Sequence, residues 1–145
     1  ASEFAGLPHR MEMVRTWNEV TFVNDSKGTN PLATENAIRQ SPRPVVLIAG
    51  GITKGVDLSP LVEPFKLLRG LVLIGQDAPL LEAVGQQAGL SAIRHAPSLE
   101  AAIREAITLA HPDDWVILSP CGASFDMFDH FADRGDQFKA IVAGL

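Results

Sequence analysis

The residues best suited to chemistry in this sequence lie in one run, residues 23–30, which read Val-Asn-Asp-Ser-Lys-Gly-Thr-Asn. The run leaves an apolar, β-branched stretch and ends just before Pro31, a residue type favoured in the first turn of a helix. Ligands of open α/β sheets lie at the carboxyl ends of strands, and the free N–H groups at a helix start suit phosphate or carboxylate. We therefore expect an anionic small molecule to bind here. Asp25 and Lys27 could orient nucleotide hydroxyls and phosphates, or they could simply pair with neighbouring side chains.

Two later loops place similar residues after apolar runs: residues 50–55 read Gly-Gly-Ile-Thr-Lys-Gly, and residues 119–124 read Ser-Pro-Cys-Gly-Ala-Ser. The first loop lacks the G-x-x-x-x-G-K-[ST] spacing of a phosphate loop. Lys54 is therefore either a point charge for a carboxylate or phosphate or an ordinary solvated lysine. We expect Ser124 to cap the last helix, whose N-terminus could also bind a carboxylate. In a parallel sheet, all three loops would lie on one rim.

Other candidate sites are weaker. The four histidines show no metal-ligand spacing such as H-E-x-x-H, so we expect no metal site within the chain. Cys121 has no evident histidine partner and is expected to be a small buried residue. The aspartates between residues 126 and 136 recur at helical spacing, which favours a solvated face over paired catalytic acids.

Alternating patterns of apolar and polar residues predict the elements that position these loops. Strands are expected at residues 11–17, 20–24, 45–49, 71–75, 91–95 and 115–118, the first two joined as a hairpin. Helices are expected at residues 31–40, 78–87, 98–111 and 125–143, with a short one after residue 57 or 59 and a break near residues 134–135. The predicted fold is α/β, a mostly parallel twisted sheet of about six strands with helices on both faces. It resembles a dinucleotide-binding (Rossmann-like) fold with an antiparallel edge from the N-terminal hairpin.

Composition narrows the possible functions. With 145 residues, of which 46% are hydrophobic, the chain is expected to form a single domain over residues 1–145. A net charge of −5 argues against a general nucleic-acid surface. No apolar run is long enough for a membrane span, and there is no secretory signal pattern. The single cysteine excludes an internal disulfide framework and fits a reducing cytoplasm.

Five motifs occur along the chain in a familiar order. They are Gly-Leu-Pro-His-Arg at residues 6–10, Asn-Asp-Ser-Lys-Gly-Thr-Asn at 24–30, Gly-Gly-x-x-Lys at 50–54, Leu-Ser-Pro-x-x-Ala-Ser-Phe-Asp-x-Phe at 118–128 and Phe-x-x-Arg-Gly-x-x-Phe at 131–138. Together they resemble the C-terminal domain of the Mur ligases over essentially the whole chain. The Asp-Ser-Lys-x-Thr-Asn motif resembles that of the family member that adds D-glutamate.

The resemblance implies an ATP-dependent amide ligase of peptidoglycan precursor synthesis with three domains, of which the N-terminal and central ATPase domains are absent from this chain. The expected partners are D-glutamate, ATP or ADP, and UDP-N-acetylmuramoyl-L-alanine through the other domains. ATP and Mg²⁺ would bind mainly to the central domain, with no nucleic acid or membrane involved. A cytoplasmic monomer is expected, and the isolated chain is expected to be inactive.

The resemblance also implies residue roles. Positions around D-glutamate correspond to Thr29, Lys54, Ser124, Phe125 and Phe131. Positions near the nucleotide correspond to His9, Arg10, Asp25, Lys27 and Asn30. No residue of this domain is assigned as catalytic.

Two alternative interpretations remain open at this point. One is a domain of another Mur ligase or of a folylpolyglutamate synthetase-like ligase, which would accept a different amino acid. The other is a non-catalytic nucleotide-binding module, although the first loop lacks the G-x-G-x-x-G pattern of dinucleotide-binding proteins.

Overall fold

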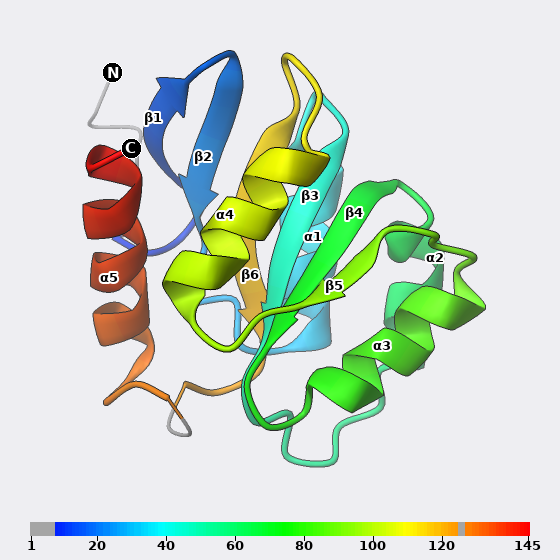
Figure 1. Ribbon diagram of the computed structural model, residues 1–145. Coiled ribbons are helices and arrows are strands. Elements are labelled where there is room, and N and C mark those ends of the chain that lie inside the picture. The colour runs from blue at the N-terminus through cyan, green and yellow to red at the C-terminus, as the bar shows by residue number, and fades with distance from the viewer. Residues whose placement is uncertain (1–7, 125–126) are drawn as a thin grey trace.

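A single six-stranded sheet runs through the molecule, which is described here from a computed structural model covering residues 8–124 and 127–145. The strands are β1 Glu12–Trp17, β2 Val20–Asn24, β3 Val45–Gly50, β4 Leu68–Ile74, β5 Ile93–His95 and β6 Trp115–Cys121. Their order across the sheet is β1-β2-β6-β3-β4-β5. Only the hairpin pair β1 and β2 is antiparallel, and each of the other neighbouring pairs is parallel. The predicted mostly parallel sheet with an antiparallel edge is confirmed (Figure 1).

Helices cover both faces of this sheet. They are α1 Pro31–Gln40, α2 Val62–Phe65 after a 3₁₀ turn at Ser59–Leu61, α3 Ala78–Gln87, α4 Leu99–Leu109 and α5 Phe131–Ala143. One core packs α1, α2 and α3 on the sheet, and the other packs α4 and α5 on the opposite face. In Figure 1, α4 crosses in front of the sheet, α1 lies behind it and α5 lies beside β1. Neighbouring residues of β3 serve different cores, since Leu47 belongs to the first and Ile48 to the second. A strand buried on both faces must be apolar throughout, which explains the continuous apolar run.

The last helix differs from its prediction. It begins at Phe131 rather than near residue 125, and it continues without a break through Gly135. Its N-cap is His130, whose Nδ1 accepts a hydrogen bond from the N–H of Ala132 at 3.1 Å. The expected cap at Ser124 is therefore wrong, because α5 begins seven residues later, at Phe131. The carbonyl of Ser124 instead accepts hydrogen bonds from the N–H groups of Met127 and Phe128, before the helix starts.

Gly135 lies inside α5 because a larger residue would not fit. A Cβ at this position would lie 2.1 Å from Nδ1 of His9. Glycine in a helix interior costs about 1 kcal/mol of stability relative to alanine. Here it allows α5 to approach the N-terminal segment closely. The glycine was interpreted from sequence as a helix break, whereas it is a packing contact.

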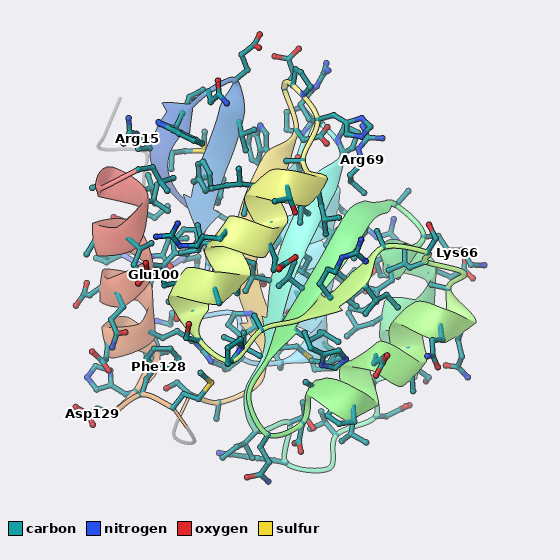
Figure 2. All side chains as sticks on the ribbon, viewed as in Figure 1. Arg15, Lys66, Arg69, Glu100, Phe128 and Asp129 are labelled. Carbon is teal, nitrogen blue, oxygen red and sulfur yellow. The ribbon has the colours of Figure 1, made fainter. Side chains whose placement is uncertain are left out.

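β1 holds the other end of α5. Arg15 donates from Nη1 to the carbonyl oxygens of Val142 and Ala143, at 3.1 and 3.2 Å. These carbonyls belong to the last turn of the helix, where they lack partners within the helix itself. Figure 2 labels Arg15 beside this end, away from Phe128 and Asp129 at the start of the helix. None of the helices among the described residues is long and apolar enough to cross a bilayer.

Candidate functional site

A cavity of about 580 Å³ opens at the carboxyl end of β2. It lies between the loop of residues 25–30, one side of α1 and the first residue of α5. Six of the residues singled out from sequence line it: Arg10, Asp25, Lys27, Thr29, Asn30 and Phe131. Four of the six belong to the expected nucleotide set, and the other two, Thr29 and Phe131, belong to the expected D-glutamate set.

Backbone hydrogen bonds fix the loop that forms this cavity. The N–H of Lys27 donates to the carbonyl of His9 at 3.0 Å, and the N–H of Cys121 donates to the carbonyl of Gly28 at 2.8 Å. The loop is thus fastened to the N-terminal segment on one side and to β6 on the other. Asn30 then caps α1, since its Oδ1 accepts from the N–H of Ala33 at 2.9 Å. The exposed Thr29 is left as the hydroxyl available to a ligand.

The carboxylate of Asp25 pairs with neighbouring protein groups, which is one of the two roles that the sequence allows for it. Its Oδ2 accepts from the Ser119 hydroxyl at 2.7 Å, and its Oδ1 accepts from the N–H of Met11 at 3.1 Å. Burial raises the pKa of this carboxyl, against the opposing effect of both hydrogen bonds and of the Arg10 charge. Asp25 therefore holds the N-terminal segment, and with it Arg10, against the sheet at the edge of the cavity.

Two cations give the cavity a positive character. Arg10 is exposed, and the half-buried Lys27 places Nζ 5.8 Å from the ring centroid of Phe131. A cation over an aromatic face is attracted by the ring quadrupole, so Phe131 steadies the ammonium group without neutralising it. The charge stays available to an anionic ligand.

His9 lies behind the cavity rather than in its lining. Asn24 directs its Oδ1 to the N–H of Ser26, so its Nδ2 donates to Nδ1 of His9 at 2.9 Å. The His9 proton is then on Nε2, which lies 3.6 Å from Asp136 Oδ1. The ring also meets Phe131 edge-on at 6.1 Å. His9 thus packs against Phe131 and the loop of residues 25–30 on the side away from the cavity.

Lys54 and Ser124 lie on two loops that are joined to each other but do not line the cavity. Ile52 and Ala123 form an antiparallel bridge, with N–H to carbonyl distances of 2.9 and 2.8 Å in the two directions. Thr53 is fastened to Asp77 Oδ2 through its N–H and its hydroxyl, at 2.8 and 3.0 Å. The three loops do meet on one rim, as predicted.

The two side chains on these joined loops are both available to a ligand. Lys54 is exposed, and within the described part of the chain its ammonium makes no hydrogen bond or ion pair. Ser124 is 2% exposed, and its Oγ has no hydrogen-bond partner among the described residues. Buried hydroxyls are nearly always hydrogen-bonded, so the Ser124 hydroxyl is a candidate donor to a bound ligand. Phe125, also expected near the amino acid, lies outside the described residues.

Arg134 is a residue whose importance the sequence analysis missed. Its side chain is 1% exposed and donates to Ser26 Oγ and the Ser26 carbonyl, each at 2.9 Å, and to the Gly122 carbonyl at 3.1 Å. A signal existed, because Arg134 is three residues after Phe131 and four before Phe138. That spacing places a charged residue on the buried face of a helix.

The residues present suit an anion better than a metal ion. Among residues 8–124 and 127–145, no three His, Cys, Asp or Glu side chains cluster in a way that could hold a metal. The cations and amide groups around the cavity fit a phosphate or the hydroxyls of a nucleotide.

Comparison with known proteins gives a consistent result. Residues 9–122 match the family described as Mur ligase, glutamate ligase domain. Three similar proteins are each named UDP-N-acetylmuramoylalanine--D-glutamate ligase. Those from Marinobacter nauticus, Burkholderia multivorans and Bacillus cereus are 48%, 45% and 43% identical and match 100%, 99% and 98% of this chain. The chain spans only about a third of their length, 33%, 28% and 32% respectively.

A solved structure supports the fold. The crystal structure of UDP-N-acetylmuramate-alanine ligase MurC from Thermotoga maritima superposes on 98% of this chain and 31% of that one, with a TM-score of 0.64. At 11% sequence identity the likeness concerns the fold alone.

Proposed function

The chain belongs to the Mur ligase family as its C-terminal, glutamate ligase domain, and on that premise we propose that it serves an ATP-dependent ligase that adds D-glutamate to UDP-N-acetylmuramoyl-L-alanine in the cytoplasm. One observation carries the proposal beyond the family. Lys27, expected near the nucleotide, and Phe131, expected near the amino acid, touch each other in one cavity. A domain that brings two substrates together needs residues from both binding sites to lie next to each other in this way.

The nucleotide side of the site is assigned to the cavity. Arg10 and Lys27 provide positive charge for phosphate oxygens, and Asn30 is near enough to the same space to contact the ribose. Asp25 and His9 act through these residues, because their polar atoms are occupied by protein groups. The ATP phosphates and Mg²⁺ are assigned mainly to the part of the ligase outside this chain.

D-glutamate is assigned to the adjoining loops. Lys54 would pair with a carboxylate, and the Ser124 hydroxyl would donate to one. Thr29, Phe125 and Phe131 would surround the rest of the molecule. When bound, ATP supplies the phosphoryl group that turns the terminal carboxylate of the nucleotide substrate into an acyl phosphate. This domain holds the amine of D-glutamate next to that carbonyl carbon. Attack gives a tetrahedral intermediate, from which phosphate leaves as the C–O bond breaks and the nitrogen loses a proton to form the amide.

The test is an assay of phosphate release by the full-length ligase that carries this chain. Release is expected with ATP, UDP-N-acetylmuramoyl-L-alanine and D-glutamate together, and L-glutamate is expected to be a poor replacement. The 145-residue chain alone should release none under the same conditions. Equal rates with D- and L-glutamate, or activity of the chain alone, would count against the proposal.

Ser124→Ala separates binding from folding. The change removes a buried hydroxyl that has no partner among the described residues, so the free energy of unfolding should stay the same or rise slightly. The KM for D-glutamate should nevertheless rise about tenfold, because a hydrogen bond to a charged group contributes about 1.5–3 kcal/mol. Urea unfolding and steady-state kinetics measure the two effects. Ser59→Ala, which changes an exposed serine in the 3₁₀ turn before α2, is the matched control for kinetics. A clear loss of stability in Ser124→Ala with unchanged KM would mean that the hydroxyl is structural.

A further inference from the structure

We propose that Arg134 and Ser26 form a positioning pair that fixes the nucleotide loop relative to the amino-acid loop. The proposal rests on the function proposed above and adds two residues to it. Neither side chain lines the cavity or is assigned to a substrate. Their role follows from what they join.

A closed set of hydrogen bonds links three segments through these two residues. Arg134 donates from Nε to Ser26 Oγ at 2.9 Å, and Ser26 Oγ donates in turn to the carbonyl of Phe131 at 2.6 Å. A second nitrogen of the guanidinium, Nη2, binds the Ser26 carbonyl at 2.9 Å. Ser26 is thereby held between the first and second turns of α5, and both residues are buried. A buried hydrogen-bonded network of this kind sets one geometry and resists small displacements.

The third nitrogen extends the network to the other substrate. Nη1 of Arg134 donates to the carbonyl of Gly122 at 3.1 Å, two residues before Ser124. Gly122 in turn lies so close to the loop after β3 that a Cβ there would be 2.8 Å from the carbonyl oxygen of Gly50. Moving Gly122 would therefore disturb the loop that carries Lys54.

The planar fork of an arginine is needed for this geometry. One guanidinium binds two loops at once because its nitrogens point in fixed, divergent directions, whereas a lysine presents one flexible point charge. Lys27 follows Ser26 directly and lies over Phe131, so the same fork determines where the Lys27 ammonium is held. Arg134 thus links the position of Lys27, on the nucleotide side, to the loops that carry Lys54 and Ser124, on the amino-acid side.

The test uses Arg134→Lys and Ser26→Ala in the full-length ligase. Each is expected to raise the KM for ATP and the KM for D-glutamate together by about tenfold, because displaced binding groups hold both substrates less tightly. The kcat at saturation should change less than either KM. A residue that merely supported folding would lower the fraction of active enzyme, and so reduce kcat while leaving both KM values unchanged.

Arg15→Lys is the matched control. It also removes arginine hydrogen bonds to α5, but at the opposite end of the helix from the site. It should lower the unfolding midpoint and leave both KM values as in the wild type. Because Arg134→Lys could reduce stability severely, Ser26→Ala carries the test independently: it deletes one hydroxyl and keeps the two carbonyl contacts of Arg134.

The double variant gives the sharpest outcome. If both residues act through the same contact, the KM values of the double variant should match those of Arg134→Lys alone rather than the product of the two effects. Multiplying effects, or a rise in only one of the two KM values, would overturn the proposal. Failure of this proposal can be told apart from failure of the proposed function. If the proposed function were wrong, the wild-type ligase itself would not use D-glutamate.

Discussion

Replacing Lys54 with methionine in the full-length ligase is expected to raise the KM for D-glutamate about 100-fold, which corresponds to about 2.7 kcal/mol. The side chain is exposed and has no partner within the described part of the chain. The backbone of its loop is fixed by the Ile52–Ala123 bridge and by Thr53. A carboxylate bound there would gain a charge-assisted hydrogen bond that methionine cannot make. The KM for ATP should change far less, because Lys54 does not line the cavity.

The matched control for this substitution is Lys66→Met. Lys66 is also exposed, and it pairs with Glu63 at 2.8 Å on the surface. An exposed pair of this kind contributes little, and it lies outside the loops of the site. Steady-state kinetics with D-glutamate as the varied substrate should show the effect in Lys54→Met alone. A similar KM in the two variants would remove Lys54 from the amino-acid site.

The backbone of Lys54 gives a second reason to expect a functional role. Its φ is +58°, in the left-handed region that a non-glycine residue occupies at a cost of about 1–2 kcal/mol. Lys54→Gly should therefore raise the free energy of unfolding while weakening D-glutamate binding as much as Lys54→Met does. Backbone strain retained at one exposed lysine is what a binding role would explain.

The sheet and most helices could be predicted because local patterns and global fold agree there. Pro31 and Asn30 start α1 where the sequence indicates, and the apolar run of β3 matches burial on both faces. β4 begins at Leu68, three residues before its predicted start, because Arg69 and Gly70 interrupt the apolar pattern without ending the strand. Elements whose boundaries depend only on periodicity and caps are thus readable from sequence.

The start of α5 and the role of Arg134 could not be predicted in the same way. Histidine is not among the usual N-caps, so His130 gave no signal, whereas Ser124 did. An arginine within a helix suggests a solvated side chain, yet the carbonyls of Ser26 and Gly122 draw it inside. Both outcomes depend on loops far away in sequence. Local spacing can place Arg134 on the buried face of α5, but it does not identify the carbonyls that Arg134 binds.

The candidate site also has features that could be predicted from the sequence and features that could not. The rim of three loops follows from the predicted parallel topology. The Ile52–Ala123 bridge and the hydrogen bond from Cys121 to Gly28 confirm that the three loops meet. That Asp25 turns its carboxylate towards Ser119 depends on a residue 94 positions away. Residue types therefore indicated where a ligand would bind, while the division between contacting and supporting residues needed the structure.

Gly51→Ala should lower the free energy of unfolding by about 3 kcal/mol, or roughly a 10 °C fall in the melting temperature. Gly51 has a φ of +107°, and a Cβ there would lie 2.2 Å from the carbonyl oxygen of Ala123. That oxygen accepts the hydrogen bond of the bridge to Ile52, so the methyl group must push the two loops apart. Urea unfolding and thermal denaturation of the chain measure the loss.

Gly55→Ala distinguishes crowding from backbone strain at this position. Gly55 is in the same loop with a φ of +72°, but nothing lies within 4 Å of a Cβ built on it. Its substitution should cost only the left-handed strain, about 1–2 kcal/mol. Equal losses in the two variants would mean that the close contact with Ala123 does not stabilise the loop pair. If Gly51→Ala alone is severe, it should also raise the KM for D-glutamate in the full-length ligase, since the bridge that it strains carries Lys54 on one side and Ser124 on the other.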